Sequence, residues 1–460
     1  MPLNPPKPAL VVFVIAFSAA AALAAHRPTF DNIRVTVSSK KFPDRAEKVL
    51  VNSDSLQQAL AARDADAIDI VKIDEESLPV LYEGAFRNVD LAQLTISDTD
   101  LEEIKPGAFA GMRRIDSLVI GENRLQSIRR GVFANLTIAK LYLDDNSIKV
   151  VESGSFAGMR MITTLVLSIN EIKILERGTF KDLPELQSLR LDFNKIETID
   201  EAAFENLPKL HRLDLDNNRI KRIDSNSFVN LPLLVVLLLE TNVIETISLK
   251  DLDSLKVLFV HDNNIKKLDM GMLDGLKSIS KVNISHNDIT TIEGVVKRGL
   301  NMVYFDLSYN DITEVPEGAF NGSSIRKLSL NDNKIRKLAP AAFNSTRTRR
   351  ILLHRNAIRS IRSGTFAKID VDELLLNNNR IERIEPGAFE YSSFQKIDLD
   401  NNKLTAIEPG TFKNVKVAFI SILNNAGMNQ KAFNNVSDLL RTGTEPARIR
   451  DRENVILDIK

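Results

Sequence analysis

The chain has 460 residues, of which 43% are hydrophobic and 27% are charged. Its 61 basic and 61 acidic side chains give a net charge of zero, which argues against a general nucleic-acid binder, because such proteins carry a basic excess. The absence of cysteine excludes disulfides, thiol catalysis and cysteine metal sites.

The first 25 residues have the pattern of a secretory signal peptide. Lys7 supplies a positive charge, residues 9–17 form an apolar core, and small residues follow as far as Ala25. An uncleaved membrane anchor is the alternative. No later run approaches the roughly 20 apolar residues that span a bilayer. We therefore expect a secreted, extracellular protein without a membrane span.

Residues 26–67 are expected to form an N-terminal cap. The alternation of Ile33, Val35 and Val37 predicts a strand, and residues 55–62 predict a short helix. Such a cap would cover the first unit of the repeated region that follows, because a terminal repeat exposes one side of its core.

Residues 68–428 contain sixteen copies of the pattern L-x-x-L-x-L-x-x-N-x-I-x-x-I. Position 9 is asparagine in fourteen copies, from Asn123 to Asn425, and only Glu76 and Thr99 break this column. The copies begin at Ile68, Leu91, Ile115, Ile138, Ile162, Leu186, Leu210, Leu234, Leu255, Ile279, Met302, Ile325, Thr348, Val371, Phe394 and Val417.

The apolar residues at positions 1, 4 and 6 predict one short strand per copy, with positions 3, 5, 7 and 8 left free of the core. Neighbouring strands would lie parallel, and the position 9 amide would bond to backbone groups that are otherwise unpaired. The fold class is an α/β solenoid, a leucine-rich repeat horseshoe with a parallel β-sheet on its concave face and mostly irregular or 3₁₀ segments on its convex side.

Residues 429–460 are expected to form a C-terminal cap and tail. Phe433 and Leu439 predict a closing helix there, and residues 455–459 predict an added strand or a loose tail.

A phenylalanine near position 19 recurs from Phe86 to Phe228 and again from Phe320 to Phe412. This fixed spacing predicts a stacked spine in the core rather than a ligand pocket. Between residues 234 and 300 this phenylalanine is missing, and the aliphatic residues Leu252, Leu273 and Val296 lie near the equivalent positions. A local change of curvature and ordinary repeat drift are both open explanations.

Position 7 carries Asp192, Asp216 and Glu240 in three consecutive copies. Like charges on neighbouring strands destabilise a sheet, so Arg190 and Arg212, raised pKa values or a basic partner should offset the repulsion. A solvated acidic lane, a partner-binding patch and a calcium site are the three alternatives.

Charge is also segregated along the chain. Residues 61–110 hold twelve acidic and four basic residues, whereas residues 321–370 hold twelve basic and two acidic residues. The basic region would suit an acidic glycan, a phosphate-bearing surface or an acidic protein, and a solvated edge or head-to-tail association are the alternatives. Exposed aromatic residues commonly anchor interfaces, so aromatic residues of the inner face join the acidic and basic residues as candidates for partner binding. These candidates are Tyr142, Asp192, Phe193, Asp216, Glu240, Phe259, Tyr304, Tyr309, Arg349, Arg350 and Arg355.

Five N-x-S/T sequons are candidates for glycosylation: Asn135, Asn283, Asn321, Asn344 and Asn435. Asn283 lies at position 5 of its copy, so a glycan there would occupy the concave face. No nucleophile motif, phosphate loop or paired-carboxylate setting is evident. His261 and His286, with Asp262 nearby, lack the fixed spacing of a metal site. We therefore expect no enzyme activity, no cofactor and no bound metal.

In unit length and phenylalanine placement the repeat resembles the typical subclass of extracellular leucine-rich repeat proteins, including Toll-type ectodomains and arthropod leucine-rich immune proteins. The resemblance covers residues 68–428 and implies binding of proteins, and sometimes of microbial glycolipids, through the inner face or its edges. The chain departs from those families in lacking cysteine caps. The favoured function is a secreted recognition module that binds another protein, for example in innate immunity. The alternative is an extracellular matrix or adhesion scaffold. The partner and the oligomeric state are not specified by the sequence.

Overall fold

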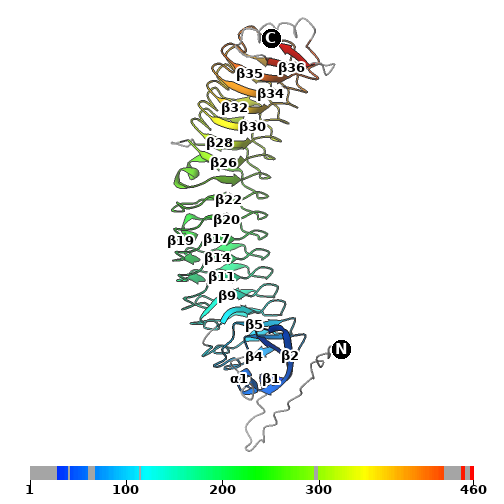
Figure 1. Cartoon of the computed structure of the whole chain (residues 1–460). Coiled ribbons are helices and arrows are strands. Elements are labelled where there is room, and N and C mark those ends of the chain that lie inside the picture. The colour runs from blue at the N-terminus through cyan, green and yellow to red at the C-terminus, as the bar shows by residue number, and fades with distance from the viewer. Residues whose placement is uncertain are drawn as a thin grey trace, which may run out of the picture. The chain divides into compact units, whose positions relative to one another are not determined.

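A computed structural model describes residues 28–39, 42–60, 68–112, 115–294, 299–428, 447–450 and 456–459. The chain divides into two compact units, one of Met1–Ile220 with Asp224–Leu234 and the other of Lys221–Ile223 with Val235–Lys460. Each unit is a stack of repeats in which every turn of the chain adds one strand to a parallel sheet (Figure 1). The predicted solenoid is therefore confirmed. The predicted signal peptide, the closing helix around Phe433 and the sequon at Asn435 lie outside the described residues.

The first unit opens with two antiparallel strands, β1 (Phe30–Ser39) and β2 (Phe42–Ser53), and a short helix α1 (Leu56–Leu60). Ile33, Val35 and Val37 are buried, as their alternation predicts for a half-buried strand. Since β1 also pairs antiparallel with the strand of the first repeat, the hairpin covers the open end of the sheet.

Seven repeats of the first unit each supply one strand of the sheet. Within this unit neighbouring strands pair in parallel, with equivalent repeat positions opposite one another. The strands are β3 (Ile70–Asp74), β5 (Gln93–Ser97), β7 (Ile115–Val119), β9 (Ile138–Tyr142), β11 (Thr164–Val166), β14 (Ser188–Arg190) and β17 (Arg212–Asp214).

The second unit continues the same arrangement with nine repeat strands, and β36 (Ala447–Arg450) and β37 (Ile456–Ile459) add a parallel and then an antiparallel strand at its end. The strand predicted at residues 455–459 is thus present. The repeat strands are β20 (Val236–Leu238), β22 (Val257–Phe259), β24 (Lys281–Asn283), β26 (Asn301–Asp306), β28 (Ser324–Ser329), β30 (Arg347–Leu352), β32 (Asp370–Leu375), β34 (Ser393–Asp398) and β35 (Lys416–Ser421).

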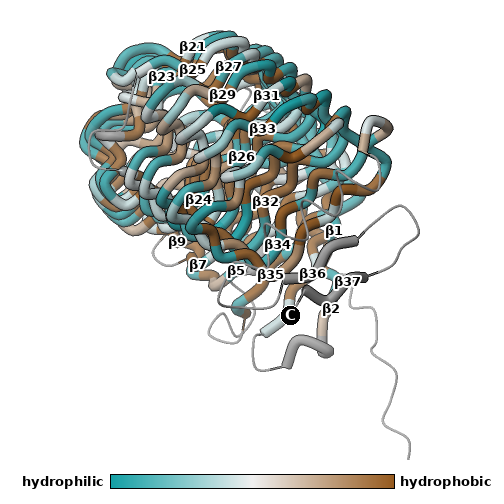
Figure 2. The backbone as a smooth tube through the Cα atoms, turned by 90° about the horizontal axis from the view of Figure 1, so that it is seen from above, coloured by the Kyte–Doolittle hydropathy of each residue, from teal (hydrophilic) through white to brown (hydrophobic). Residues whose placement is uncertain are grey.

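Among the described residues, the returning segments are turns, short strands and the 3₁₀ helices η2 (Ser225–Ser227) and η3 (Met270–Gly275). In Figure 2, hydrophobic stretches follow strands such as β32 and β34, whereas hydrophilic residues predominate around β21 and β25. The short strands are β4 (Val80–Leu81), β6 (Glu103–Ile104), β8 (Ser127–Ile128), β10 (Val150–Val151), β12 (Ile174–Leu175), β13 (Phe180–Lys181), β15 (Thr198–Ile199), β16 (Phe204–Glu205), β18 (Arg222–Ile223), β19 (Phe228–Val229), β21 (Thr246–Ile247), β23 (Lys267–Asp269), β25 (Thr291–Glu293), β27 (Glu314–Val315), β29 (Lys337–Leu338), β31 (Ser360–Ile361) and β33 (Arg383–Ile384).

Position 9 asparagines join adjacent repeats through their buried amides, as predicted. The Nδ2 of Asn170 donates to the carbonyls of Leu143 (2.9 Å) and Leu167 (3.1 Å), and its Oδ1 accepts from the backbone N–H of Ile148 (3.0 Å). One side chain therefore satisfies backbone groups of its own repeat and of the repeat before it. The same pattern recurs in later repeats.

The predicted phenylalanine spine is present in both units. In the first unit the rings stack from Phe86 to Phe228, with neighbouring centroids 5.5–6.1 Å apart. In the second unit the stack runs from Phe320 to Phe412. Where the column lapses, Leu252 and Leu273 are buried in place of rings, while Val296 lies outside the described residues. None of the helices among the described residues is long and apolar enough to cross a membrane.

Candidate functional site

The side chains that project from the sheet at repeat positions 2, 3, 5, 7 and 8 form what we call the sheet face. Because the register of the second unit is regular, residues at one repeat position form a row across the strands. The position 3 row contains Lys281, Tyr304, Lys327, Arg350 and Glu373, each opposite the next. Three of these five side chains are cationic, so this part of the sheet face carries a positive charge.

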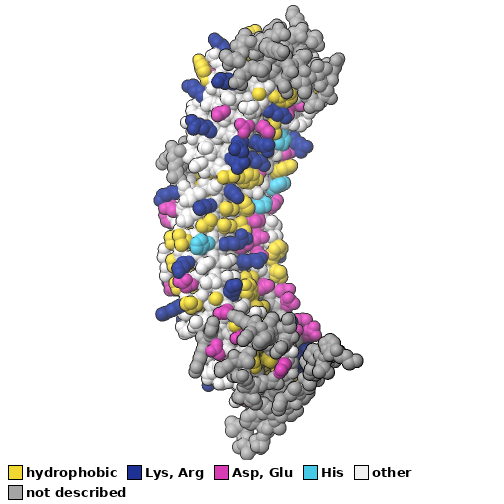
Figure 3. Space-filling view, viewed as in Figure 1, with side chains coloured by type: hydrophobic (Ala, Val, Ile, Leu, Met, Phe, Trp, Pro, Cys, Tyr) yellow, Lys and Arg dark blue, Asp and Glu magenta, His cyan; other side chains and the backbone are white. Residues whose placement is uncertain are grey.

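A hollow of about 450 Å³ lies along this row, and we call it the basic groove. Figure 3 shows Lys and Arg side chains gathered over β28 and β30. The groove includes three of the candidates predicted from the sequence, Tyr304, Arg349 and Arg350. Its lining residues are Val303, Tyr304, Arg326, Lys327, Arg349, Arg350, Asp372 and Glu373.

The cations of the basic groove differ in how far they are neutralised. Arg350 forms an ion pair with Glu373, with 2.9 Å between Nε and Oε2. The Nζ of Lys327 lies 5.3 Å from the ring centroid of Tyr304, which is within the range of a cation–π contact. No carboxylate of a described residue lies within 4.0 Å of Arg326 or Arg349, and both side chains are exposed. These two guanidinium groups are therefore available to an anionic ligand.

Tyr304 is held in place from the other side by Asp306, whose carboxylate accepts a hydrogen bond from the Tyr304 hydroxyl. Burial, followed by this contact with a carboxylate, raises the pKa of Tyr304 above its ordinary value. The ring is therefore fixed as an uncharged platform at the wall of the basic groove.

Other predicted aromatic candidates are distributed over the two units. Phe193 is 54% exposed in the first unit, where Tyr142 is half-buried. In the second unit Tyr309 is 46% exposed and its ring stacks on His286 at 4.4 Å between centroids. Phe259 is half-buried, and its ring makes a T-shaped contact with that of His261 at 6.2 Å between centroids. Phe193 and Tyr309 thus expose apolar surface that no described neighbour covers.

The acidic candidates of position 7 do not form one solvated lane. Asp192 is buried, accepts hydrogen bonds from Arg190 Nε (3.1 Å) and Nη2 (3.0 Å), and accepts a third from the Ser168 hydroxyl (2.5 Å). The expectation that Asp192 is free of the core is wrong, because the short strand leaves its carboxylate packed between two repeats. Arg190 is the predicted internal cation, and the hydrogen bond to Asp192 raises the pKa of that guanidinium.

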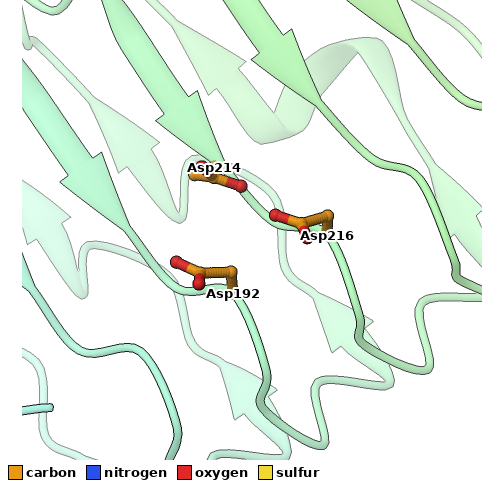
Figure 4. A group of neighbouring side chains, drawn as sticks. All are labelled: Asp192, Asp214 and Asp216. Atoms are coloured by element: carbon orange, nitrogen blue, oxygen red, sulfur yellow. The ribbon is translucent and has the colours of Figure 1, made fainter.

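Asp216 lies beside a third carboxylate that the sequence reasoning missed, Asp214 at position 5. Arg212, the second predicted cation, donates to Asp214 Oδ2 (2.6 Å) and not to Asp216. Figure 4 shows the carboxyl groups of Asp214 and Asp216 turned toward one another. Burial, followed by contact with the Asp216 carboxyl, raises the pKa of Asp214 to about 7. Reading positions 5 and 7 together would have revealed this pair.

The remaining candidates are half-buried or exposed. Glu240 is half-buried at position 7 of the second unit, and Arg355 is exposed and lies 3.5 Å from Asp332 in an ion pair. His261 Nε2 lies 3.8 Å from the Asp262 carboxylate, and the ring of His286 stacks on Tyr309. Among the described residues the group whose oxygens are close enough to hold a metal ion is Asp192, Asp214 and Asp216.

The described sequons occupy different surroundings. Asn135 and Asn321 are exposed, and Asn344 is half-buried. Asn283 lies at the end of β24 on the sheet face, where its Oδ1 accepts from the backbone N–H (3.1 Å) and the hydroxyl (2.7 Å) of Ser285. A glycan on Asn283 would therefore project from the same face as the basic groove.

Family models match most of the repeated region. A model described as a leucine rich repeat matches residues 90–139, 137–196, 184–244 and 240–289, and one described as a BspA type leucine rich repeat region matches residues 313–440. The chain is a leucine-rich repeat protein. No curated protein matches its sequence. The leucine-rich repeat fold is typically a protein-binding scaffold without catalytic activity.

Solved structures share this leucine-rich repeat fold at low sequence identity. The Drosophila Toll-Spatzle complex is 18% identical with a TM-score of 0.52, over 76% of this chain and 51% of that chain. The LRIM1/APL1C complex is also 18% identical with a TM-score of 0.52, over 82% of this chain and 64% of that chain. A leucine-rich repeat protein of Leptospira interrogans is 19% identical with a TM-score of 0.47, over 78% of this chain and 89% of that chain. The chain thus spans about half the length of the Toll chain that it matches.

Proposed function

We propose that this leucine-rich repeat protein is a secreted recognition module that binds another protein through the sheet face of its second unit. The observation that carries the proposal is the basic groove, which is lined by the unneutralised guanidinium groups of Arg326 and Arg349 and by the fixed ring of Tyr304. Arginine and tyrosine are the residue types most enriched at the energetic centres of protein interfaces.

The chemistry of the basic groove favours an acidic segment of the partner. A carboxylate can accept two parallel hydrogen bonds from one guanidinium group, which gives both affinity and orientation. The exposed side chain of Val303 beside these cations adds apolar contact that a purely polyanionic ligand would not use. For this reason we favour an acidic protein segment over an acidic glycan.

The setting that we propose is extracellular, with innate immunity as the specific case. The signal-like residues 1–25 and the sequons support secretion. The Toll-Spatzle complex is a molecular hub in Drosophila development and innate immunity, and this fold likeness supports the immune setting. Expression of the full chain in a secretory cell tests this part. Protein in the medium whose N-terminus begins near residue 25 is the expected result, and retention in the cytosol would contradict it.

Capture from the native extracellular fluid tests the binding function. We expect the wild-type chain to retain one protein in a constant molar ratio and the double variant R326E/R349E to lose it. The matched control is R359E/R362E, which makes the same change of charge on exposed arginines of the neighbouring loop. Equal capture by all three proteins, or capture that disappears when glycans are removed enzymatically from the fluid, would contradict a protein partner at the basic groove.

A further inference from the structure

Three carboxylates of the first unit converge where β14 and β17 end. One carboxyl oxygen from each of Asp192, Asp214 and Asp216 lies within 4.8 Å of each of the others. Figure 4 shows that Asp214 and Asp216 come from one repeat and Asp192 from the repeat beside it. Asp214 and Asp216 stand at positions 5 and 7 of one repeat, and Asp192 stands at position 7 of the repeat before it. The parallel register of the two strands brings these positions together.

Asp214 provides an observation independent of this clustering. Its side chain is only 5% exposed, and its Oδ2 accepts from Arg212. Its Oδ1 is buried without a hydrogen-bond partner. A buried carboxylate oxygen without a partner is costly, and native structures leave few of them unless an ion or water fills the place. Figure 4 shows the carboxyl group of Asp214 turned toward Asp216, which places this group in the cluster.

The charges around the cluster are not balanced. Arg190 and Arg212 pair with Asp192 and Asp214 respectively. Asp216 accepts a hydrogen bond from the Asn217 amide, and no lysine or arginine of the described residues lies within 4.0 Å of its carboxylate. When all three carboxyl groups are ionised they face two guanidinium groups, and the resulting repulsion between Asp214 and Asp216 is one that a cation would remove.

We propose that Asp192, Asp214 and Asp216 form a divalent cation site with calcium as its ion. Carboxylate oxygens are the donors that hard cations require, and calcium accepts six to eight oxygen ligands in flexible geometry. Asp216 is half-exposed, so water has access to complete the coordination shell. Asp192 contributes through oxygens that already accept from Arg190 and Ser168, which makes it the weakest of the three ligands.

The site would stabilise the first unit rather than take part in chemistry. A bound ion would link two adjacent repeats through Asp192 on one and Asp214 and Asp216 on the other. Because binding to the folded state alone raises stability by mass action, calcium should raise the melting temperature of the protein. This role is independent of the basic groove, which lies in the other unit.

Calorimetric titration of the chelator-treated full chain with calcium chloride, and separately with magnesium chloride, tests the site. We expect one calcium ion to bind per chain with a Kd on the order of 10⁻⁴ to 10⁻³ M, as in weak extracellular calcium modules. D214N and D216N should each weaken binding at least tenfold. D144N is the matched control, because it removes an aspartate at position 7 two repeats away and should bind calcium like the wild type.

Melting temperatures measured in calcium and in EDTA give a second readout. The wild type and D144N should melt higher in calcium, whereas D216N, at a half-exposed position that tolerates the change, should show no difference. Absence of heat and of a melting shift with either metal in the wild type would overturn the site. Wild-type affinity in D214N and D216N would overturn it as well, because the ion would then bind elsewhere.

Discussion

At the scale of single residues, the asparagine at repeat position 9 holds one repeat to the next. Asn263 shows the full set of contacts. Its Nδ2 donates to the carbonyls of Leu239 (3.0 Å), Val260 (3.1 Å) and His261 (3.1 Å), and its Oδ1 accepts from the Ile244 N–H (2.8 Å). The asparagine amide combines two N–H donors with a carbonyl acceptor, and no other side chain of similar size does so.

We predict that N263A lowers the free energy of unfolding by about 2–4 kcal/mol, because an unpaired buried backbone group costs about 1–3 kcal/mol and more than one is left. Chemical denaturation followed by circular dichroism measures the change. The control is N264A, the adjacent asparagine, whose side chain is exposed. A loss of less than about 0.5 kcal/mol in N263A, which is the range of ordinary surface substitutions, would contradict the role of the ladder.

His354 supplies a second prediction, on the dependence of stability on pH. Burial lowers the pKa of His354 below its ordinary value, and its Nδ1 has no hydrogen-bond partner. The unfolded chain takes up a proton near pH 6.5, whereas the folded chain resists doing so until lower pH. Stability is therefore full above pH 6.5 and falls as the pH drops from 6.5 toward the lowered pKa.

We predict that H354Q loses less stability than the wild type between pH 7.5 and pH 5. Denaturation midpoints at several pH values measure this difference. H211Q, which changes an exposed histidine, serves as the control and should keep the wild-type pH dependence. If the denaturation midpoints of the wild type and H354Q fall equally between pH 7.5 and pH 5, His354 does not govern the pH dependence of stability in this range.

At the scale of structural elements, the returning segments depend on the phenylalanine spine rather than on helices. Phe204 in β16 is fully buried, and its ring lies 5.6 Å from those of Phe180 and Phe228. These stacked rings fill the space between short strands whose backbone bonds are few. Each ring therefore supports its own repeat and both neighbours.

We predict that F204A lowers the free energy of unfolding by about 3–5 kcal/mol, the usual cost of removing a buried ring and leaving a cavity. F193A is the matched control, since Phe193 is 54% exposed in the same repeat and should cost less than about 1 kcal/mol. Thermal and denaturant unfolding measure both. Comparable losses in the two variants would mean that the spine is not the main support of these segments.

The sequence predicts the elements that repeat and predicts poorly the side chains that meet across repeats. The strands, the asparagine ladder and the stacked rings follow from spacing alone, because each unit is bounded by the same neighbours. The burial of Asp192 and the convergence of Asp214 on Asp216 depend on how far a short strand extends and which way each carboxyl turns. The same limit applies to the basic groove, where Arg326 and Lys327 line the wall but only Tyr304, Arg349 and Arg350 were expected.

At the scale of the whole molecule, a net charge of zero conceals a strong segregation. Residues 321–370, with twelve basic and two acidic residues, include the cations of the basic groove. A local field of one sign accelerates the encounter with an oppositely charged partner even when the protein as a whole is neutral. Binding of the proposed acidic partner should therefore depend on salt in a way that net charge does not indicate.

We predict that raising sodium chloride from 0.05 to 0.5 M weakens binding of the captured partner at least tenfold, mainly through a slower association rate. Salt shortens the range of charge interactions to roughly 4 Å at 0.5 M, and rim charges act chiefly on association. Surface plasmon resonance at several salt concentrations measures both rates. R359E/R362E should keep most of the salt dependence of the wild type, because it leaves the basic groove intact. A salt-independent association rate in the wild type would mean that apolar contacts at Val303 and Tyr309, rather than the guanidinium groups, bring the partner to the sheet face.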